Sequence, residues 1–152
     1  MVSDTHGRVH PGVFDKLAGV DRILHAGDVG DESVLADLEA IAPVACVRGN
    51  VDEESGLAAP LERLLDLDGT RVLLIHQAPR PDALPRSWRE RLARDRVRVV
   101  VCGHTHEPHL AERGSVLFLN PGGCGRPRFG LPLSVARLVP GEPPRAEILR
   151  LS

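Results

Sequence analysis

The sequence predicts a single α/β domain over residues 1–152, in which two β-sheets pack face to face with helices on the outside. Two patterns predict this class. Strand-like apolar runs alternate with helical patterns in the first half of the chain, and pairs of strands joined by tight turns follow in the second half. The length suffices for one large core, and no linker or internal repeat divides the sequence.

The first half should form βαβ units. Asp31 is placed to cap a helix, because its carboxylate can accept hydrogen bonds from the free N–H groups of the first turn. The run that ends at Val47 is apolar throughout, so we expect a buried strand there. The expected elements are strands over 1–3, 22–25 and 44–47, helices over 11–17 and 32–41, and a loop over 53–60.

The second half should form hairpins. The dipeptide Asp68-Gly69 stands between two strand-like runs and is a strong signal for a tight turn. Trp88 and Leu92 lie one helical turn apart and give a short helix an apolar face. The expected elements are strands over 61–67, 71–75, 97–102, 109–112, 115–119, 133–139 and 145–151, a helix over 87–94 and a proline-rich loop over 79–85.

Short polar clusters stand where the apolar runs end, and they are the most informative feature of the chain. The five clusters are Asp4-Thr5-His6-Gly7, Gly27-Asp28, Gly49-Asn50, His76 and Gly103-His104-Thr105-His106. Ligands of open α/β sheets bind at the carboxyl ends of the strands, so we expect the clusters to meet. Their two carboxylates, one amide and four imidazoles are typical of a two-metal hydrolytic centre, which activates water and holds a phosphoryl group.

The spacing within the clusters supports metal binding. Asp4 and His6 are two residues apart, as are His104 and His106, and alternate residues of an extended backbone project to the same side. Neighbouring glycines permit tight turns and a close approach of the backbone. A set of oxygen and nitrogen ligands without sulfur suits Mn, Fe, Zn, Co or Ni.

Each cluster taken alone also fits an ordinary structural role. Gly27-Asp28 and Gly49-Asn50 are common turn sequences, and a lone His76 fits a half-buried histidine with a hydrogen-bond partner. The joint occurrence of all five clusters at strand ends favours the metal centre. Three further histidines show no partner pattern and are assigned surface or structural roles: His10, His25 and His109. An alternative for His25 is a place near the metals, because it precedes Asp28 by one turn of chain.

Formal charge favours a phosphodiester as the substrate. Two divalent ions contribute +4, Asp4 and Asp28 contribute −2, and a bridging hydroxide leaves +1, which a diester monoanion neutralises. A monoester dianion would leave the site with a net charge of −1, unless nearby arginines add positive charge. The net charge of −2 on the whole chain gives no general attraction to nucleic acid or to anionic membranes.

These motifs, in this order, resemble the calcineurin-like metallophosphoesterase superfamily, and in particular its small prokaryotic YfcE-type branch. The resemblance covers nearly the whole chain and implies a four-layer αββα sandwich with a dinuclear metal centre. The segments that carry it are Ser3-Asp4-Thr5-His6-Gly7, His25-Ala26-Gly27-Asp28, Arg48-Gly49-Asn50-Val51-Asp52, His76, Gly103-His104-Thr105-His106 and Asn120-Pro121-Gly122.

The resemblance also implies a role for each ligand. One metal is expected on Asp4, His6, Asp28 and His106, and the other on Asp28, Asn50, His76 and His104. The expected ions are two divalent metals, manganese first, with Fe, Zn, Ni or Co as alternatives. Asp28, Asn50 and His104 are the expected catalytic residues. A hydroxide that bridges the metals would attack phosphorus in line, while the ions and Asn50 stabilise the developing charge.

The sequence departs from the family pattern in three places. Val51 stands where larger relatives have a histidine that protonates the leaving group. Water or another residue is therefore expected to supply that proton, and good leaving groups should be preferred. Gln77 replaces a glycine after His76, so the local turn should differ. The first motif begins at Ser3, so the first strand should be short.

Arginines supply two further candidate sites. The loop at 120–123 is expected near the centre, because its counterpart in the family lies there, and Arg126 and Arg128 could then reach a phosphate. Arg126, together with Asn50, is the expected substrate contact. The arginines at 86, 89, 91, 94, 96 and 98 form a basic cluster, which fits a solvated helix face or, as an alternative, a nucleic-acid contact.

The sequence therefore predicts a cytoplasmic phosphoesterase, more active on diesters than on monoesters, with a small phosphate ester as its partner and a tendency to form homo-oligomers. A nuclease is one alternative. A catalytically weak interaction scaffold, similar to the small retromer subunit, is the other, and the intact ligand set argues against it. We expect neither a membrane span nor a signal peptide. Cys46, Cys102 and Cys124 lack metal-ligand spacing and fit free thiols in a reducing compartment.

Overall fold

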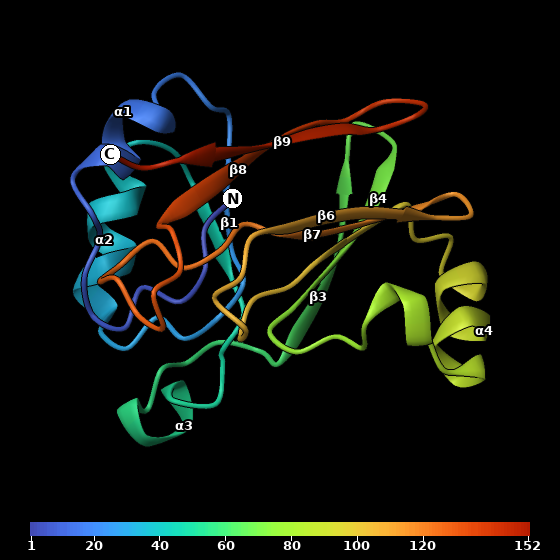
Figure 1. Cartoon of the computed structure of the whole chain (residues 1–152), viewed down its shortest axis with the longest axis horizontal. Helices are drawn as coiled ribbons and strands as arrows, with labels where there is room; N and C mark the ends of the chain where they lie inside the picture. Colours follow the sequence, from blue (N-terminus) through green and yellow to red (C-terminus); the bar gives the residue numbers. More distant parts are fainter.

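The computed structural model describes residues 1–152, apart from the side chain of Ser55, and arranges them in an α/β fold (Figure 1). In chain order the elements are α1 (Gly12–Lys16), β1 (Ile23–His25), α2 (Glu32–Glu39), β2 (Val44–Cys46), α3 (Asp52–Ser55), β3 (Glu62–Leu67), β4 (Thr70–Ile75), η1 (Pro81–Ala83), α4 (Arg86–Arg94), β5 (Val99–Val101), β6 (His109–Arg113), β7 (Val116–Asn120), β8 (Ser134–Val139) and β9 (Arg145–Arg150). None of the described helices is long and apolar enough to cross a membrane.

One sheet has five strands in the order β3-β4-β5-β7-β6. The three central strands, β4, β5 and β7, run parallel, and the edge strands β3 and β6 pair antiparallel with their neighbours through the predicted hairpins. β5 consists of the fully buried residues Val99–Val101. A run of β-branched residues suits this position, because a central parallel strand is covered on both faces.

The other sheet is completed by the first residues of the chain. β1 pairs parallel with β2, and β8 pairs antiparallel with β9. Val2 lies beside β1, since its N–H donates to Leu24 O at 2.9 Å and its carbonyl accepts from Ala26 N at 2.9 Å. On the other side, Ala136 N of β8 donates to Met1 O at 3.0 Å. The strand predicted over 1–3 is thus reduced to a single bridge at Val2, as short as expected.

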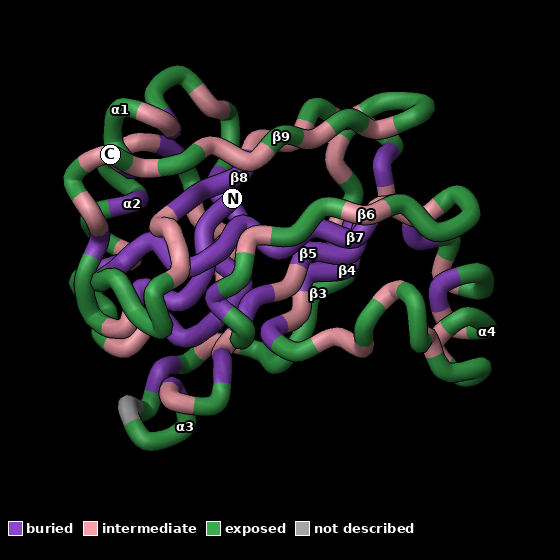
Figure 2. The backbone as a smooth tube through the Cα atoms, viewed as in Figure 1, coloured by how far each residue is buried: buried purple, intermediate pink, exposed green. Residues whose placement is uncertain are grey.

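Three apolar clusters hold the layers together and confirm the predicted αββα sandwich. The middle cluster lies between the sheets and includes Leu24 of β1, Val72 of β4 and Ala136 of β8. A second cluster packs α1 and α2 on the outer face of the sheet that contains β1 and β8. The third packs Leu92 of α4 against the outer face of the five-stranded sheet. Figure 2 shows the buried strands β4, β5 and β7 in the interior and mostly exposed residues on α4.

Most predicted elements are confirmed, with small corrections. Asp31 caps α2, because its carboxylate accepts a hydrogen bond from Ser33 N at 2.8 Å. The strand at 44–47 was expected to be buried, but β2 is half-buried because it lies at the edge of its sheet with a single strand neighbour. The predicted loop over 53–60 begins with the short helix α3, and the proline-rich loop contains η1.

Candidate metal centre

The structure brings the five polar clusters together, as predicted. Asp4 follows the bridge at Val2, Asp28 follows β1, Asn50 follows β2, His76 follows β4 and the histidine pair at 104–106 follows β5. Within each sheet these segments run parallel, so their carboxyl ends lie at the same edge of that sheet. The side chains form two neighbouring groups, and Asp28 lies between them.

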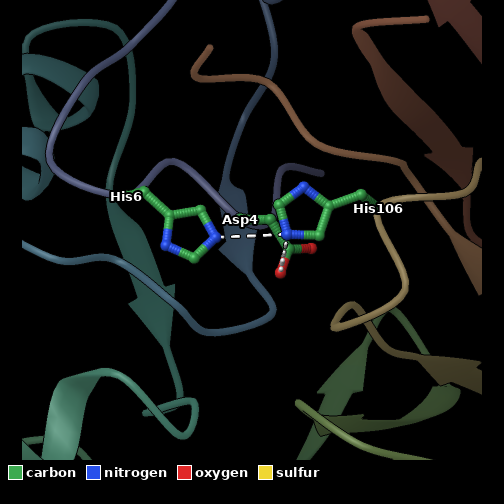
Figure 3. A group of neighbouring side chains, drawn as sticks. All are labelled: Asp4, His6 and His106. Atoms are coloured by element: carbon green, nitrogen blue, oxygen red, sulfur yellow. Dashed lines mark hydrogen bonds and ion pairs between the residues drawn. The ribbon is translucent and has the colours of Figure 1, made fainter. Parts of the chain in front are cut away.

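The first group contains Asp4, His6 and His106, which are drawn in Figure 3. The Nε2 atoms of His6 and His106 lie 3.2 Å apart, and the two rings are stacked with their centroids 5.1 Å apart. His106 Nε2 lies 3.6 Å from Asp4 Oδ1. Asp4 and His106 are buried, whereas His6 is partly exposed. One potential ligand atom from each residue lies within 4.8 Å of the others, so the group could hold a cation.

The second group is centred on the side-chain oxygen of Asn50. His76 Nε2 and His104 Nδ1 each lie 3.1 Å from Asn50 Oδ1. Asp28 stands between the groups, because its Oδ1 lies 3.3 Å from His76 Nε2 and its Oδ2 lies 3.8 Å from His6 Nε2. One carboxylate therefore faces both groups, as a bridging ligand must. Asn50 and His104 are exposed, which leaves this side of the centre open to a substrate.

The orientation of His76 tests whether these residues fit a metal. Its Nδ1 lies 2.8 Å from Ala26 O, and a carbonyl only accepts, so Nδ1 carries the hydrogen. In the neutral ring, Nε2 then directs a lone pair toward the oxygens of Asn50 and Asp28, which are themselves acceptors. Such converging lone pairs repel unless a metal ion lies among them or a proton on Nε2 of the charged ring is donated to Asp28. The oxygen and nitrogen donors therefore fit a divalent transition metal.

The backbone of the ligand residues corrects one part of the sequence argument. Both paired motifs were expected in extended backbone, but the φ angles are +54° at Asp4, +46° at His6, +55° at Asp28, +70° at His104 and +59° at His106. The side chains are therefore aimed by left-handed turns. Such angles are uncommon for residues other than glycine and store strain, which is concentrated at functional sites in many proteins.

Two glycines allow the loops to approach one another. A Cβ atom at Gly49 would overlap the Asp28 carboxylate, and a Cβ atom at Gly103 would overlap Ser3 and lie 2.8 Å from Asp4 Oδ2. Without those side chains, His104 N comes within 3.2 Å of both Asp4 carboxylate oxygens and can donate to them. Glycine is required at these two positions because the loops approach one another too closely to leave room for a side chain.

Asp52 is a structural part of the site to which sequence analysis assigned no role. Its buried carboxylate accepts hydrogen bonds from Gly30 N at 2.8 Å, Gly49 N at 2.8 Å and Val29 N at 3.1 Å. These donors flank Asp28 and Asn50, so Asp52 ties together the two loops that carry them. The available signal was the position of Asp52 in the same short motif as Asn50.

Two other neighbours shape the centre. Gln77, noted only as a departure from the family pattern, places its Nε2 3.4 Å from both Asn50 Oδ1 and His104 Nδ1. His25 is fully buried beneath the site, where Gly27 N donates to its Nδ1 at 3.2 Å. Its Nε2 therefore carries the hydrogen and donates to Thr5 Oγ1 at 2.9 Å.

The loop after β7 lies beside the first group, as predicted. Asn120 Nδ2 donates to Gly103 O at 2.9 Å and to Thr105 Oγ1 at 3.0 Å, and Gly123 N donates to His106 O at 3.4 Å. Further along this loop, Arg126 has an exposed side chain. Its contact with substrate stays a prediction.

The charges of the site favour neutral histidines in the first group. Burial lowers the pKa of His6 and of His106, and the positive charge of Arg128 lowers both further. Burial is the largest influence on the pKa of His76 and lowers it, but the hydrogen bonds to Asp28 and Ala26 O and the charges of Asp28 and Asp4 together outweigh burial and raise the pKa. For Asp28, hydrogen bonds from His76 and Val51 N outweigh burial and lower the pKa.

Comparisons with known proteins agree with this geometry. A family model described as "Calcineurin-like phosphoesterase superfamily domain" matches residues 1–140. The chain is similar to a probable metallophosphoesterase of Methanothermobacter thermautotrophicus, with 36% identity over 99% of this chain and 90% of the relative. It is also similar to the phosphodiesterase YfcE of Escherichia coli K12, with 33% identity over 66% of this chain and 54% of that protein.

A solved structure shows the same fold at lower identity. Vps29 from Entamoeba histolytica, in a complex with Zn²⁺, superposes with a TM-score of 0.74 at 19% identity, over 98% of this chain and 96% of that one. The matched family model and the archaeal relative each span most of the chain. The chain therefore belongs to the calcineurin-like phosphoesterase superfamily.

Proposed function

We propose that this protein is a phosphodiesterase that uses two divalent metal ions, with manganese as the first candidate and Fe, Zn, Ni or Co as alternatives. The observation that carries the proposal is the position of Asp28. Its two carboxylate oxygens face His6 at 3.8 Å and His76 at 3.3 Å. One ion would be held by Asp4, His6, Asp28 and His106, and the other by Asp28, Asn50, His76 and His104.

Bound ions of this kind activate water and neutralise charge on a phosphoryl group. The side chains of the open face would position the ester. Asn50 directs its oxygen toward His76 and His104, so its amide N–H group is free to donate to a phosphoryl oxygen. A donor at that position stabilises the negative charge that develops on the oxygen during attack.

The proposed site offers little help to the leaving group. Val51 is apolar, and Gln77, the polar neighbour of Asn50, can donate a hydrogen bond but cannot transfer a proton. The departing oxygen therefore leaves as an anion or takes its proton from water or from a residue other than Val51 and Gln77. We expect rates to depend steeply on the acidity of the leaving alcohol.

The preference for diesters is supported by the similarity of this chain to the phosphodiesterase YfcE. Formal charge alone does not favour diesters over monoesters, because the positive charge of Arg128 also acts on His6 and His106. The proposed substrate is a small phosphate ester. A cytoplasmic location is part of the proposal, and three free cysteines support a reducing compartment.

The test compares hydrolysis of bis-p-nitrophenyl phosphate and p-nitrophenyl phosphate by the Mn²⁺-loaded protein. We expect faster turnover of the diester, and a loss of about a hundredfold or more in Asp28→Asn and in His104→Ala. His109→Ala is the matched control, since it removes an exposed histidine of β6.

Equal, negligible turnover by the wild type and both site variants would favour the interaction scaffold over the enzyme. Cleavage of single-stranded RNA or plasmid DNA at a rate above that of the small diester would favour the nuclease.

A further inference from the structure

Phe129 occupies an unusual position beside the centre. Its side chain is 79% exposed, more than any other large apolar side chain recorded as exposed among the described residues. Its ring meets the His106 ring edge to face, with centroids 5.4 Å apart and an interplanar angle of 89°. His106 belongs to the first ligand group, so a large apolar surface stands free at the mouth of the site.

The turn that presents Phe129 is a poor place for this residue type. Leu131 N donates to Arg128 O at 3.0 Å, and the two central residues of the turn have positive φ angles, +56° at Phe129 and +70° at Gly130. Turns of this kind favour Asn, Asp or Gly at the first central position, because bulky residues are strained there. A strained side chain that buries so little surface contributes little to folding, so its presence calls for another role.

A cation accompanies the aromatic ring. Arg128 precedes Phe129 in the same turn, and the Phe129 ring of that turn contacts His106 of the first group. An ester whose phosphoryl group lies on the ligand groups would therefore find a positive charge and an aromatic face on the same side. Arginine suits the phosphate, and an aromatic face suits a planar ring.

We propose that Phe129 is a specificity-determining residue that stacks on an aromatic group of the substrate, such as an aryl ring or a nucleobase, while Arg128 contacts the phosphate. The inference rests on the proposed function, since it assumes that a phosphate ester binds at the centre. It narrows the substrate class to diesters that carry an aromatic ring close to the phosphorus.

The test is binding, measured by calorimetry on the full-length Mn²⁺-loaded protein. Diphenyl phosphate and diethyl phosphate carry the same charge, but only the first has aromatic groups, and both are poor substrates. We expect Phe129→Ala to weaken binding of diphenyl phosphate about tenfold and to leave diethyl phosphate unchanged. Phe129→Tyr should retain the wild-type preference. Phe14→Ala, which removes an exposed phenylalanine of α1, should change neither affinity.

Two more variants separate a binding role from a structural one. Phe129→Asn suits the turn better, so we expect a higher melting temperature together with weaker binding of diphenyl phosphate. A merely structural Phe129 would give a lower melting temperature. Arg128→Ala should weaken the binding of both esters by the same factor, because both carry the phosphate group that Arg128 contacts.

The inference is overturned if wild-type protein does not prefer diphenyl phosphate, or if Phe129→Ala keeps that preference. Failure of the proposed function would look different. In that case the wild type would not hydrolyse bis-p-nitrophenyl phosphate at all, whatever its affinity for the aryl ester.

Discussion

His25 shows how a single residue couples the site to pH. The ring is fully buried, accepts from Gly27 N and donates to Thr5 Oγ1, which in turn donates to Val29 O at 3.0 Å. This network requires the neutral ring. Burial lowers the pKa of His25 to about 4 from an ordinary value of 6.5.

The lowered pKa of His25 predicts the direction of an acid effect on stability. The unfolded chain binds a proton at His25 below pH 6.5, whereas the folded chain does so only near pH 4. Stability is therefore complete above pH 6.5 and falls as the pH drops toward 4, by about 3 kcal/mol from this residue. Urea unfolding at pH 7 and pH 4.5 should show a smaller difference for His25→Phe than for the wild type. If the stability difference between pH 7 and pH 4.5 is the same in His25→Phe and in the wild type, His25 is not the source of the acid effect.

The convergence of the candidate ligand residues was predictable, because each of them stands next to a strand end. Their backbone geometry was not predictable in this way. Residues 4 and 6 satisfy the spacing of an extended pair, yet both adopt left-handed φ angles. The spacing of a motif does not report the conformation of a turn, because tertiary contacts hold Asp4 and His6 in strained positions.

At the scale of elements, the loops after β1 and β2 depend on each other through Asp52. Asp52→Ala leaves three donors without this acceptor: the buried Val29 N and Gly49 N and the partly buried Gly30 N. Each loss at a buried donor costs about 1–3 kcal/mol. We expect a loss of about 3 kcal/mol in unfolding free energy and a loss of tenfold or more in Mn²⁺ affinity. Denaturant unfolding and metal titration measure the two effects.

Asp66→Ala provides the control for that prediction. The Asp66 carboxylate accepts a single hydrogen bond from Gly69 N in an exposed turn, so its loss should cost about 1 kcal/mol or less and leave metal affinity unchanged. Equal effects of the two substitutions would show that Asp52 does not organise the centre.

The same two loops are in contact at Gly49. Gly49→Ala places a methyl group against the Asp28 carboxylate and its backbone N, so we expect reduced Mn²⁺ affinity together with lower stability. Gly19→Ala is the comparison, because Gly19 has open space around it but a φ of +74°. Gly19→Ala should lower stability and leave the Mn²⁺ affinity unchanged. Retained Mn²⁺ affinity in Gly49→Ala would show that the loops can separate without harm to the site.

The order of strands and helices followed from sequence because local patterns determine it. Apolar periodicity located β3 to β9 to within about two residues, and Asp31 identified the start of α2. Contacts between distant segments were not visible in the same way. Gln77 was noted as a local departure, but it contacts Asn50 and His104, each 27 residues away. Phe129 was not noted, because its partner His106 is brought near only by folding.

For the whole molecule, metal binding should contribute to stability. The centre contains the buried carboxylates of Asp4 and Asp28, and the lone pairs of His76 Nε2 and Asn50 Oδ1 point toward each other. Ions that bind only the folded chain stabilise it, by about 2.7 kcal/mol at a concentration of one hundred times the Kd. For a domain of this size that corresponds to about 5–10 °C in Tm. Thermal unfolding with Mn²⁺ and with EDTA should differ by this amount in the wild type and by much less in Asp28→Asn. Identical Tm values in the wild type would contradict a folded-state metal site.

The most direct test of the central claim is anomalous diffraction at the manganese edge from crystals grown with Mn²⁺. We expect two anomalous peaks about 3.5–4 Å apart, with Asp28 between them and the two ligand groups on either side. One peak alone, or peaks remote from Asp28, would contradict a dinuclear centre in this protein.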